Sequence, residues 1–151
     1  MSKAATNLVT FKPSRARLWL FVLVYPPHII EEIRGVGVSH GINLSLSHFF
    51  ILSSIGLILM AIGILLAQRL RFPQLLEIVL GTVFVLNALS HIANCVVIRG
   101  YDAGVITGTV LFIPLGLTTL IRLRNSMPRL RYFAAVALGF AAQVIITLLA
   151  L

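Results

Sequence analysis

The sequence predicts an all-α protein that crosses a membrane about five times, and three observations lead to this prediction. First, 59% of the 151 residues are hydrophobic and 11% are charged, with a mean hydropathy of +1.04, whereas soluble domains carry about 25% charged residues. Second, the apolar runs are long enough to cross a bilayer as helices, which takes about 20 residues each. Third, lysines and arginines flank these runs. We therefore expect a polytopic membrane helix bundle that forms a single domain over residues 1–151.

Five apolar segments are separated by polar or glycine-rich turns. Residues 1–14 are polar and contain Pro13, which predicts a short tail. Pro26 and Pro27 fall inside the first segment, so its helix is expected to kink or restart there, because each proline removes a backbone donor. The glycine-rich residues 35–41 predict a loop. The expected spans are about 16–34, 46–67, 73–98, 103–120 and 132–151.

The cationic residues predict the orientation of the bundle. With alternating loops, one side receives ten lysines and arginines, and the other receives only Arg34 and Arg99. Cytoplasmic loops carry the excess of Lys and Arg, so we expect a cytoplasmic N-terminus and a non-cytoplasmic C-terminus. The net charge of +8 belongs to this topology, and no nucleic-acid partner is expected because no basic patch with interleaved aromatic residues occurs. The ten residues are Lys3, Lys12, Arg15, Arg17, Arg69, Arg71, Arg122, Arg124, Arg129 and Arg131.

Ionisable residues interrupt the first span close to its expected non-cytoplasmic end. A charged group inside a bilayer costs about 2.5–3.5 kcal/mol on insertion scales, so such residues usually have a function. At about 100° per residue, Glu31 and Glu32 lie within about 60° of His28, one on each side, so that all three share a helix face. In the third span Asn87 and His91 are four residues apart and share another face. Topology places the two faces at a similar depth.

This pattern predicts a metal site. An acid and a histidine at i, i+3, met by a histidine from another helix, is how helix bundles assemble carboxylate–histidine metal sites. Imidazole with carboxylate suits zinc or non-haem iron. Glu31 and Glu32 are also the candidate catalytic residues, as general acid and base on a bound lipid. The expected ligands are His28, Glu31, Glu32 and His91, with Asn87 and His48 as secondary ligands.

For four other polar residues we expect structural roles. Glu77, near the cytoplasmic end of its span, is expected to pair with Arg69 or Arg71. Asp102 can pair with Arg99 or cap the fourth helix, and the cap is the preferred expectation. Gln143 is expected to form an interhelical hydrogen bond. His40, in the glycine-rich loop, is expected to be a plain loop residue.

Three motifs in the chain have the order and spacing of motifs in a known family. They are His28-x-x-Glu31-Glu32, Asn87-x-x-x-His91 and Tyr101-x-x-Gly104. Together they resemble the HXXEE-domain family of small membrane proteins, in which the third motif contains a proline–glycine pair; Ala103 stands in place of the proline here. The resemblance extends from the first span into the fourth. It implies a membrane protein with a shared polar site, and it implies no reaction, because the function of that family is undetermined.

The leading functional hypothesis is a metal-binding membrane protein, in one form a hydrolase or oxidoreductase acting on a lipid or another apolar substrate. A metal-free lipid- or sterol-binding protein, or an acid–base isomerase, would use the carboxylates directly. A proton-coupled transporter would use the same residues as a relay, and it is less favoured because the five unrepeated spans lack the two-fold architecture of many carriers. The expected partners are the lipid bilayer and an apolar small molecule.

Overall fold

The computed structural model describes residues 15–35 and 45–150, and all regular structure in this part of the chain is helical. The predicted tail and the loop residue His40 lie outside these residues. The elements are α1 (Arg15–Ile33), α2 (Leu46–Arg69), α3 (Pro73–Ile98), α4 (Val105–Thr107), the π-helical η1 (Gly108–Phe112), α5 (Ile113–Leu123) and α6 (Arg129–Ala150). Because α4, η1 and α5 follow one another without a break, they form one helical segment, and the described chain has five long helices whose bounds lie within a few residues of the expected ones.

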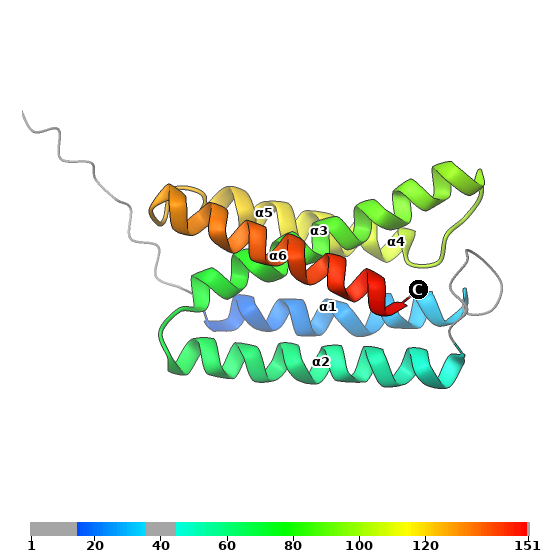
Figure 1. Ribbon diagram of the computed structural model, residues 1–151, viewed down its shortest axis with the longest axis horizontal. Coiled ribbons are helices and arrows are strands. Elements are labelled where there is room, and N and C mark those ends of the chain that lie inside the picture. Colours follow the sequence, from blue (N-terminus) through cyan, green and yellow to red (C-terminus); the bar gives the residue numbers. More distant parts are fainter. Residues whose placement is uncertain (1–14, 36–44, 151) are drawn as a thin grey trace, which may run out of the picture.

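Four of these five helices are long and apolar enough to cross a membrane. Each contains an 18-residue stretch of high mean hydropathy, at 2.7 in α2, 1.8 in α3, 1.7 in the segment from Val105 to Leu123 and 2.1 in α6. Large apolar side chains such as Val97 and Leu130 are exposed on them, as expected of surfaces that face lipid. The prediction of a polytopic helical membrane protein is therefore confirmed. Helix α1 lies beside α2 (Figure 1) but carries charged residues near both ends, so its crossing of the membrane stays a prediction.

Helix α3 is the central element, because it contacts α1, α2, α5 and α6 (Figure 1). Small residues bring its backbone close to two of these neighbours. A Cβ atom on Gly116 of α5 would lie 2.6 Å from the carbonyl oxygen of Gly81, and one on Gly139 of α6 would lie 2.8 Å from that of Val79. Membrane helices commonly use small residues in this way, because apolar side chains gain little by leaving lipid. These crossings fix α5 and α6 against α3.

A cluster of three phenylalanines forms the core beneath the polar residues. Phe84 of α3 stacks on Phe112 of η1 with ring centroids 3.9 Å apart, and Phe21 of α1 meets Phe84 edge-on at 5.1 Å. All three side chains are buried. Because the rings come from three different segments, the cluster sets the positions of α1, α3 and η1 relative to one another.

Helix α1 continues through its two prolines and does not restart there. Pro26 and Pro27 lie inside one uninterrupted α-helix, and both side chains are exposed. Each proline costs the helix one hydrogen bond, and contacts of α1 with α2, α3, α4 and η1 hold its course. The continuous helix keeps the following residues in helical register, so His28 and Glu32 stand one turn apart.

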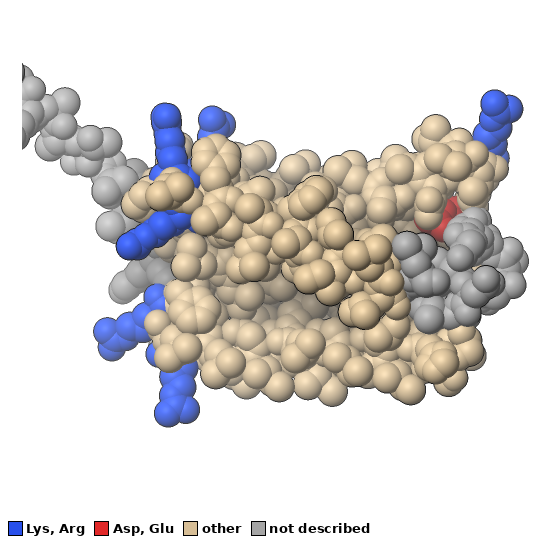
Figure 2. Space-filling view, viewed as in Figure 1, with Lys and Arg blue, Asp and Glu red and all other residues tan. Residues whose placement is uncertain are grey.

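Arginines gather at one end of the bundle, called the basic end here, where α1, α3 and α6 begin and α2 and α5 end (Figure 2). That this end faces the cytoplasm stays a prediction. Glu77 is buried near it and forms an ion pair with Arg122 of α5. The expectation that Glu77 pairs with Arg69 or Arg71 is wrong in its choice of partner: the α3–α5 contact brings in a residue 45 positions away along the chain.

Candidate metal centre

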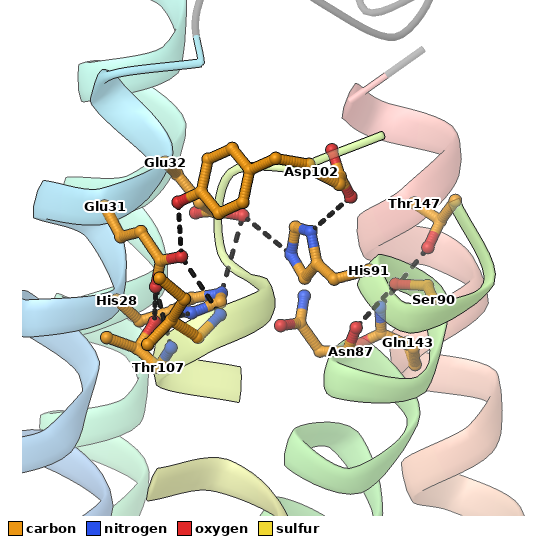
Figure 3. Close-up of polar contacts among 12 residues, drawn as sticks. His28, Glu31, Glu32, Asn87, Ser90, His91, Asp102, Thr107, Gln143 and Thr147 are labelled. Carbon is orange, nitrogen blue, oxygen red and sulfur yellow. Dashed lines mark hydrogen bonds and ion pairs between the residues drawn. The ribbon is translucent and has the colours of Figure 1, made fainter. Parts of the chain in front are cut away.

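Two histidines and one glutamate converge near the other end of the bundle. Glu32 Oε1 lies 3.2 Å from His91 Nε2 and 3.5 Å from His28 Nε2, and one ligand atom from each of the three residues lies within 4.8 Å of the others. His28 and Glu32 come from α1 and His91 from α3, so the cluster joins two helices (Figure 3). The His28 side chain is 1% exposed, that of His91 12% and that of Glu32 20%. The cluster is therefore largely shielded from solvent and opens at Glu32.

The imidazole of His91 is oriented by Asp102. His91 Nδ1 lies 2.8 Å from Asp102 Oδ2, and the Asp102 side chain is buried. A carboxylate only accepts hydrogen bonds, so Nδ1 carries the ring proton and donates a hydrogen bond to Asp102. In the neutral ring, Nε2 is then the lone-pair nitrogen, and this is the atom that faces Glu32. The expectation that Asp102 caps the fourth helix is wrong, because the N-cap is Gly104 and no side chain of its own segment caps it.

The imidazole of His28 is oriented by a different pair. Its Nδ1 lies 2.8 Å from the hydroxyl oxygen of Thr107, and that hydroxyl lies 2.5 Å from Glu31 Oε2. The single hydroxyl proton goes to the Glu31 carboxylate, which can only accept, so Thr107 accepts from His28 Nδ1–H. The other nitrogen, Nε2, is buried and has no hydrogen-bond partner among the residues described. When both rings are neutral, each therefore has its lone pair on Nε2, the ring nitrogen nearest the Glu32 carboxylate.

Glu31 stabilises the start of α4, the segment that packs against it. Besides the Thr107 hydroxyl, its carboxylate accepts from the backbone N–H groups of Ile106 at 3.0 Å and Thr107 at 2.7 Å, and from the Tyr101 hydroxyl at 2.6 Å. Glu31 thereby caps the first turn of α4 from another helix, where N–H groups lack helical partners. The hydrogen bond to Glu31 raises the pKa of Tyr101 to about 12, so the phenol stays protonated at neutral pH and remains a donor.

Gly104 lies in the turn that precedes α4, where its backbone packs directly against the imidazoles of His91 and His28. Its φ of 106° is in the left-handed region that favours glycine. A Cβ atom at this position would lie 2.7 Å from His91 Nε2 and 3.0 Å from His28 Cε1. On the other side, Phe112 packs on His28 with ring centroids 4.2 Å apart. A π-helical turn such as η1 is frequent at functional sites, and here it carries Phe112 to the His28 ring.

Substitution of Gly104 by alanine is expected to destabilise the protein and to displace the histidines. The left-handed backbone alone costs a residue with a side chain about 1–2 kcal/mol, and the new methyl group would overlap His91. Thermal unfolding of the purified protein in detergent should show a lower midpoint than wild type. Gly100→Ala is the matched control, because its Cβ atom would meet no atom closer than 3.8 Å. Equal midpoints for the two variants would contradict this role of Gly104.

The structure does not bring every predicted ligand into the cluster. His48 is exposed at the N-terminal turn of α2, where its Nδ1 lies 3.1 Å from the Ser45 hydroxyl. Glu31 points to Thr107 and Tyr101, away from the Nε2 atoms. Asn87 lies one turn before His91, and Figure 3 shows its amide beneath the His91 ring, on the side toward His28. The Asn87 Oδ1 atom is buried and has no hydrogen-bond partner in the described part of the chain.

Thr107 is a site residue that the sequence did not reveal. It lies 79 positions from His28, and an isolated threonine in an apolar span carries no pattern of its own. The one available signal was its place three residues after the glycine of the third motif. For Asp102, the neighbouring residues in the chain suggest only a helix cap or a local ion pair.

The fold and the site together define a class of protein: a helical membrane protein with a buried His28–Glu32–His91 cluster whose side chains could hold a metal ion. Within this class, the chain belongs to the family described as "protein of unknown function with HXXEE motif", which matches residues 19–119. The resemblance drawn from the three motifs is therefore confirmed, and the match contains all three cluster residues. No curated protein and no solved structure matches the chain.

Proposed function

We propose that His28, Glu32 and His91 bind one divalent metal ion, either zinc or non-haem iron. The observation that carries the proposal is the spacing of the three ligand atoms. Two atoms that each lie roughly 2.1 Å from a tetrahedral ion are roughly 3.4 Å apart, and the distances from Glu32 Oε1 to the two Nε2 atoms are 3.2 and 3.5 Å. Hydrogen bonds between nitrogen and a carboxylate are usually shorter, at about 2.7–2.9 Å.

The hydrogen-bond partners of the histidines support the same proposal. Histidines that bind metals almost always donate their other N–H to a carboxylate, a carbonyl or water, which fixes the tautomer and raises the basicity of the ligand. Asp102 accepts the hydrogen bond from His91 Nδ1–H directly. For His28 the acceptor is the Thr107 hydroxyl, which in turn donates to Glu31. Glu31, expected from the sequence as a ligand and as a catalytic residue, is therefore assigned to positioning.

Two imidazoles and one carboxylate leave coordination positions open, which is the composition of catalytic rather than structural zinc sites and of non-haem iron centres. Such an ion, when bound, supplies Lewis-acid activation of water or of a substrate oxygen. Glu32 is the carboxylate at the exposed edge of the cluster, so we assign the proton-transfer role to it. Asn87 is the candidate for a further ligand or for a donor to the substrate. The position among lipid-facing helices favours a hydrolase or oxidoreductase that acts on a lipid or another apolar molecule.

Elemental analysis of the detergent-purified protein tests the proposal. Freshly prepared wild type should contain one equivalent of zinc or iron per chain. His28→Ala and His91→Ala should each lose it, because two remaining ligands bind a metal ion too weakly to survive purification. His48→Ala is the matched control and should retain the metal, since this histidine is exposed on α2.

A wild-type protein without stoichiometric metal, which also binds none when zinc or ferrous iron is added, would overturn the proposal. The cluster would then be an ion triad available for acid–base chemistry. Loss of the metal in the His48→Ala control as well would place the binding site elsewhere.

A further inference from the structure

We infer that two exposed Arg-Leu-Arg segments at the basic end bind the headgroups of anionic phospholipids, independently of the proposed metal. The tripeptide Arg-Leu-Arg occurs three times in the chain, at residues 69–71, 122–124 and 129–131. All three copies lie at the basic end, the first at the end of α2, the second at the end of α5 and the third at the start of α6. The structure uses these copies in two different ways.

The copy at residues 122–124 is directed into the bundle. Its leucine, Leu123, is 2% exposed and packs with Ile78 of α3 and Ala135 of α6. Its first arginine forms the ion pair with Glu77. This copy therefore serves contacts within the protein.

The other two copies face outward. Leu70 is 62% exposed and Leu130 is 82% exposed, and each copy is followed by an exposed aromatic ring, Phe72 or Phe133. The four arginines of these two copies are exposed as well, and none of them forms an ion pair with a described residue. At a helix end in a membrane, such side chains reach the phosphate level while their apolar neighbours stay among the acyl chains. The four arginines are Arg69, Arg71, Arg129 and Arg131.

The charges at the basic end select the headgroup. The chain has four acidic residues, of which three lie at the cluster end, while Glu77 is buried and paired with Arg122. Figure 2 shows arginines projecting from the basic end with no acidic side chain among them on this face. An ammonium group of a zwitterionic lipid would thus find arginines and no carboxylate. A headgroup with a net negative charge fits instead, because guanidinium groups bind phosphate through paired hydrogen bonds.

The apolar neighbours of the arginines select a lipid over a soluble anion. Leu130 and Phe133 surround the arginine pair of α6, and Leu70 and Phe72 surround that of the α2–α3 turn. A soluble phosphate would leave these side chains in water. A phospholipid satisfies both parts of each segment, since its phosphate meets the arginines and its acyl chains cover the leucine and the phenylalanine.

The rest of α6 offers a charged headgroup no comparable contact. From Tyr132 to Leu149 the helix carries no charged residue. Gln143 is 7% exposed, and its Nε2 donates to the hydroxyl of Thr147, 3.3 Å away on the same helix. The expectation of an interhelical hydrogen bond is therefore not met by this contact. The headgroup contact of α6 is thus confined to its first turn.

Native mass spectrometry of the full chain in a neutral detergent tests this inference with two lipids that have the same acyl chains, phosphatidylglycerol and phosphatidylcholine. Wild type should retain two molecules of phosphatidylglycerol and bind them about 25-fold more tightly than phosphatidylcholine, because each arginine near a negative headgroup adds about fivefold. The double variants Arg69→Gln/Arg71→Gln and Arg129→Gln/Arg131→Gln should each lose one of the two lipids. The combined fourfold variant should lose both.

Arg34→Gln/Arg99→Gln is the matched control. It removes the same two charges as each double variant, but at the other end of the bundle and from arginines that belong to no Arg-Leu-Arg segment, so it should retain both lipids. Inorganic phosphate added in excess should displace neither lipid, because it has no apolar part. All six substituted arginines are exposed, so every variant should unfold at the wild-type temperature.

Four outcomes would overturn the inference. Equal retention of the two lipids by wild type would remove the selectivity for a negative headgroup. Two lipids retained by the fourfold variant would exclude the Arg-Leu-Arg segments. An equal loss in Arg34→Gln/Arg99→Gln would assign the binding to net charge alone, and displacement by inorganic phosphate would make the sites general anion sites. Metal content, measured on the same samples, reports separately on the proposed function.

Discussion

Replacing Asp102 with asparagine is expected to weaken metal binding about 10–100-fold, which is the usual effect of changing a residue that orients a metal-binding histidine. The carboxylate accepts from His91 Nδ1 at 2.8 Å, and its negative charge makes Nε2 a stronger electron donor to a metal ion. Asparagine has the same shape and can still accept through its amide oxygen, but it lacks the charge. The fold should therefore be retained, with one metal ion bound more weakly.

Competition with a chromophoric chelator, at fixed pH and detergent concentration, measures this change in affinity. Ser45→Ala is the matched control, because Ser45 contacts the Nδ1 atom of a histidine outside the cluster, and its affinity should equal that of wild type. A purely structural role for Asp102 would lower the unfolding temperature of the metal-free protein along with the affinity. Wild-type affinity in Asp102→Asn, in a protein whose His91→Ala variant loses the metal, would exclude a role of Asp102 through His91.

The helices and the depth of the site could be predicted because both follow from hydropathy and charge. Apolar runs bounded by arginines fix the number of helices, and alternation of the loops places His28 and His91 at one depth. Depth does not determine, however, toward which neighbour a side chain points from its helix. Depth alone groups His48 with His28 and His91, whereas the structure has His48 exposed on α2.

The different roles of the two adjacent glutamates could not be predicted, because helical spacing places both beside His28. Tertiary contacts decide between them. The turn before α4 brings the N–H groups of Ile106 and Thr107 to Glu31, and this leaves Glu32 for the histidines. The route of that turn depends on the left-handed backbone of Gly104, and a sequence pattern gives no information about how a loop returns to a helix 70 residues away.

The partner of Glu77 illustrates the same limit at the basic end of the bundle. Arg69 and Arg71 are near Glu77 in sequence and at a suitable depth, which made them the expected counter-ions. Packing of α3 against α5 instead places Arg122 beside Glu77. Hydropathy predicts which helices exist but not which faces meet, and here the close approach of Gly81 and Gly116 determines the meeting faces.

This ion pair leads to a large expected effect on stability. Arg122→Leu should lower the free energy of unfolding by about 3–5 kcal/mol, because it removes the ion-pair partner of the Glu77 carboxylate, which is 1% exposed. Glu77→Leu should cost less, since the Arg122 side chain is 20% exposed at a helix end, where a long cationic side chain can extend to water. The double variant should recover most of the loss, because two apolar residues of similar volume often replace a buried ion pair without cost.

Unfolding by denaturant in mixed micelles measures all three variants. Arg124→Leu controls for the loss of a positive charge at the basic end, since Arg124 is exposed two residues further on, and it should lie within about 0.5 kcal/mol of wild type. If Arg122→Leu is as stable as this control, Glu77 does not depend on Arg122 for its charge. If instead the double variant is no more stable than Arg122→Leu alone, the cost comes from lost packing of the arginine stem. Only recovery in the double variant identifies the unpaired buried charge of Glu77 as the cause of the loss of stability in Arg122→Leu.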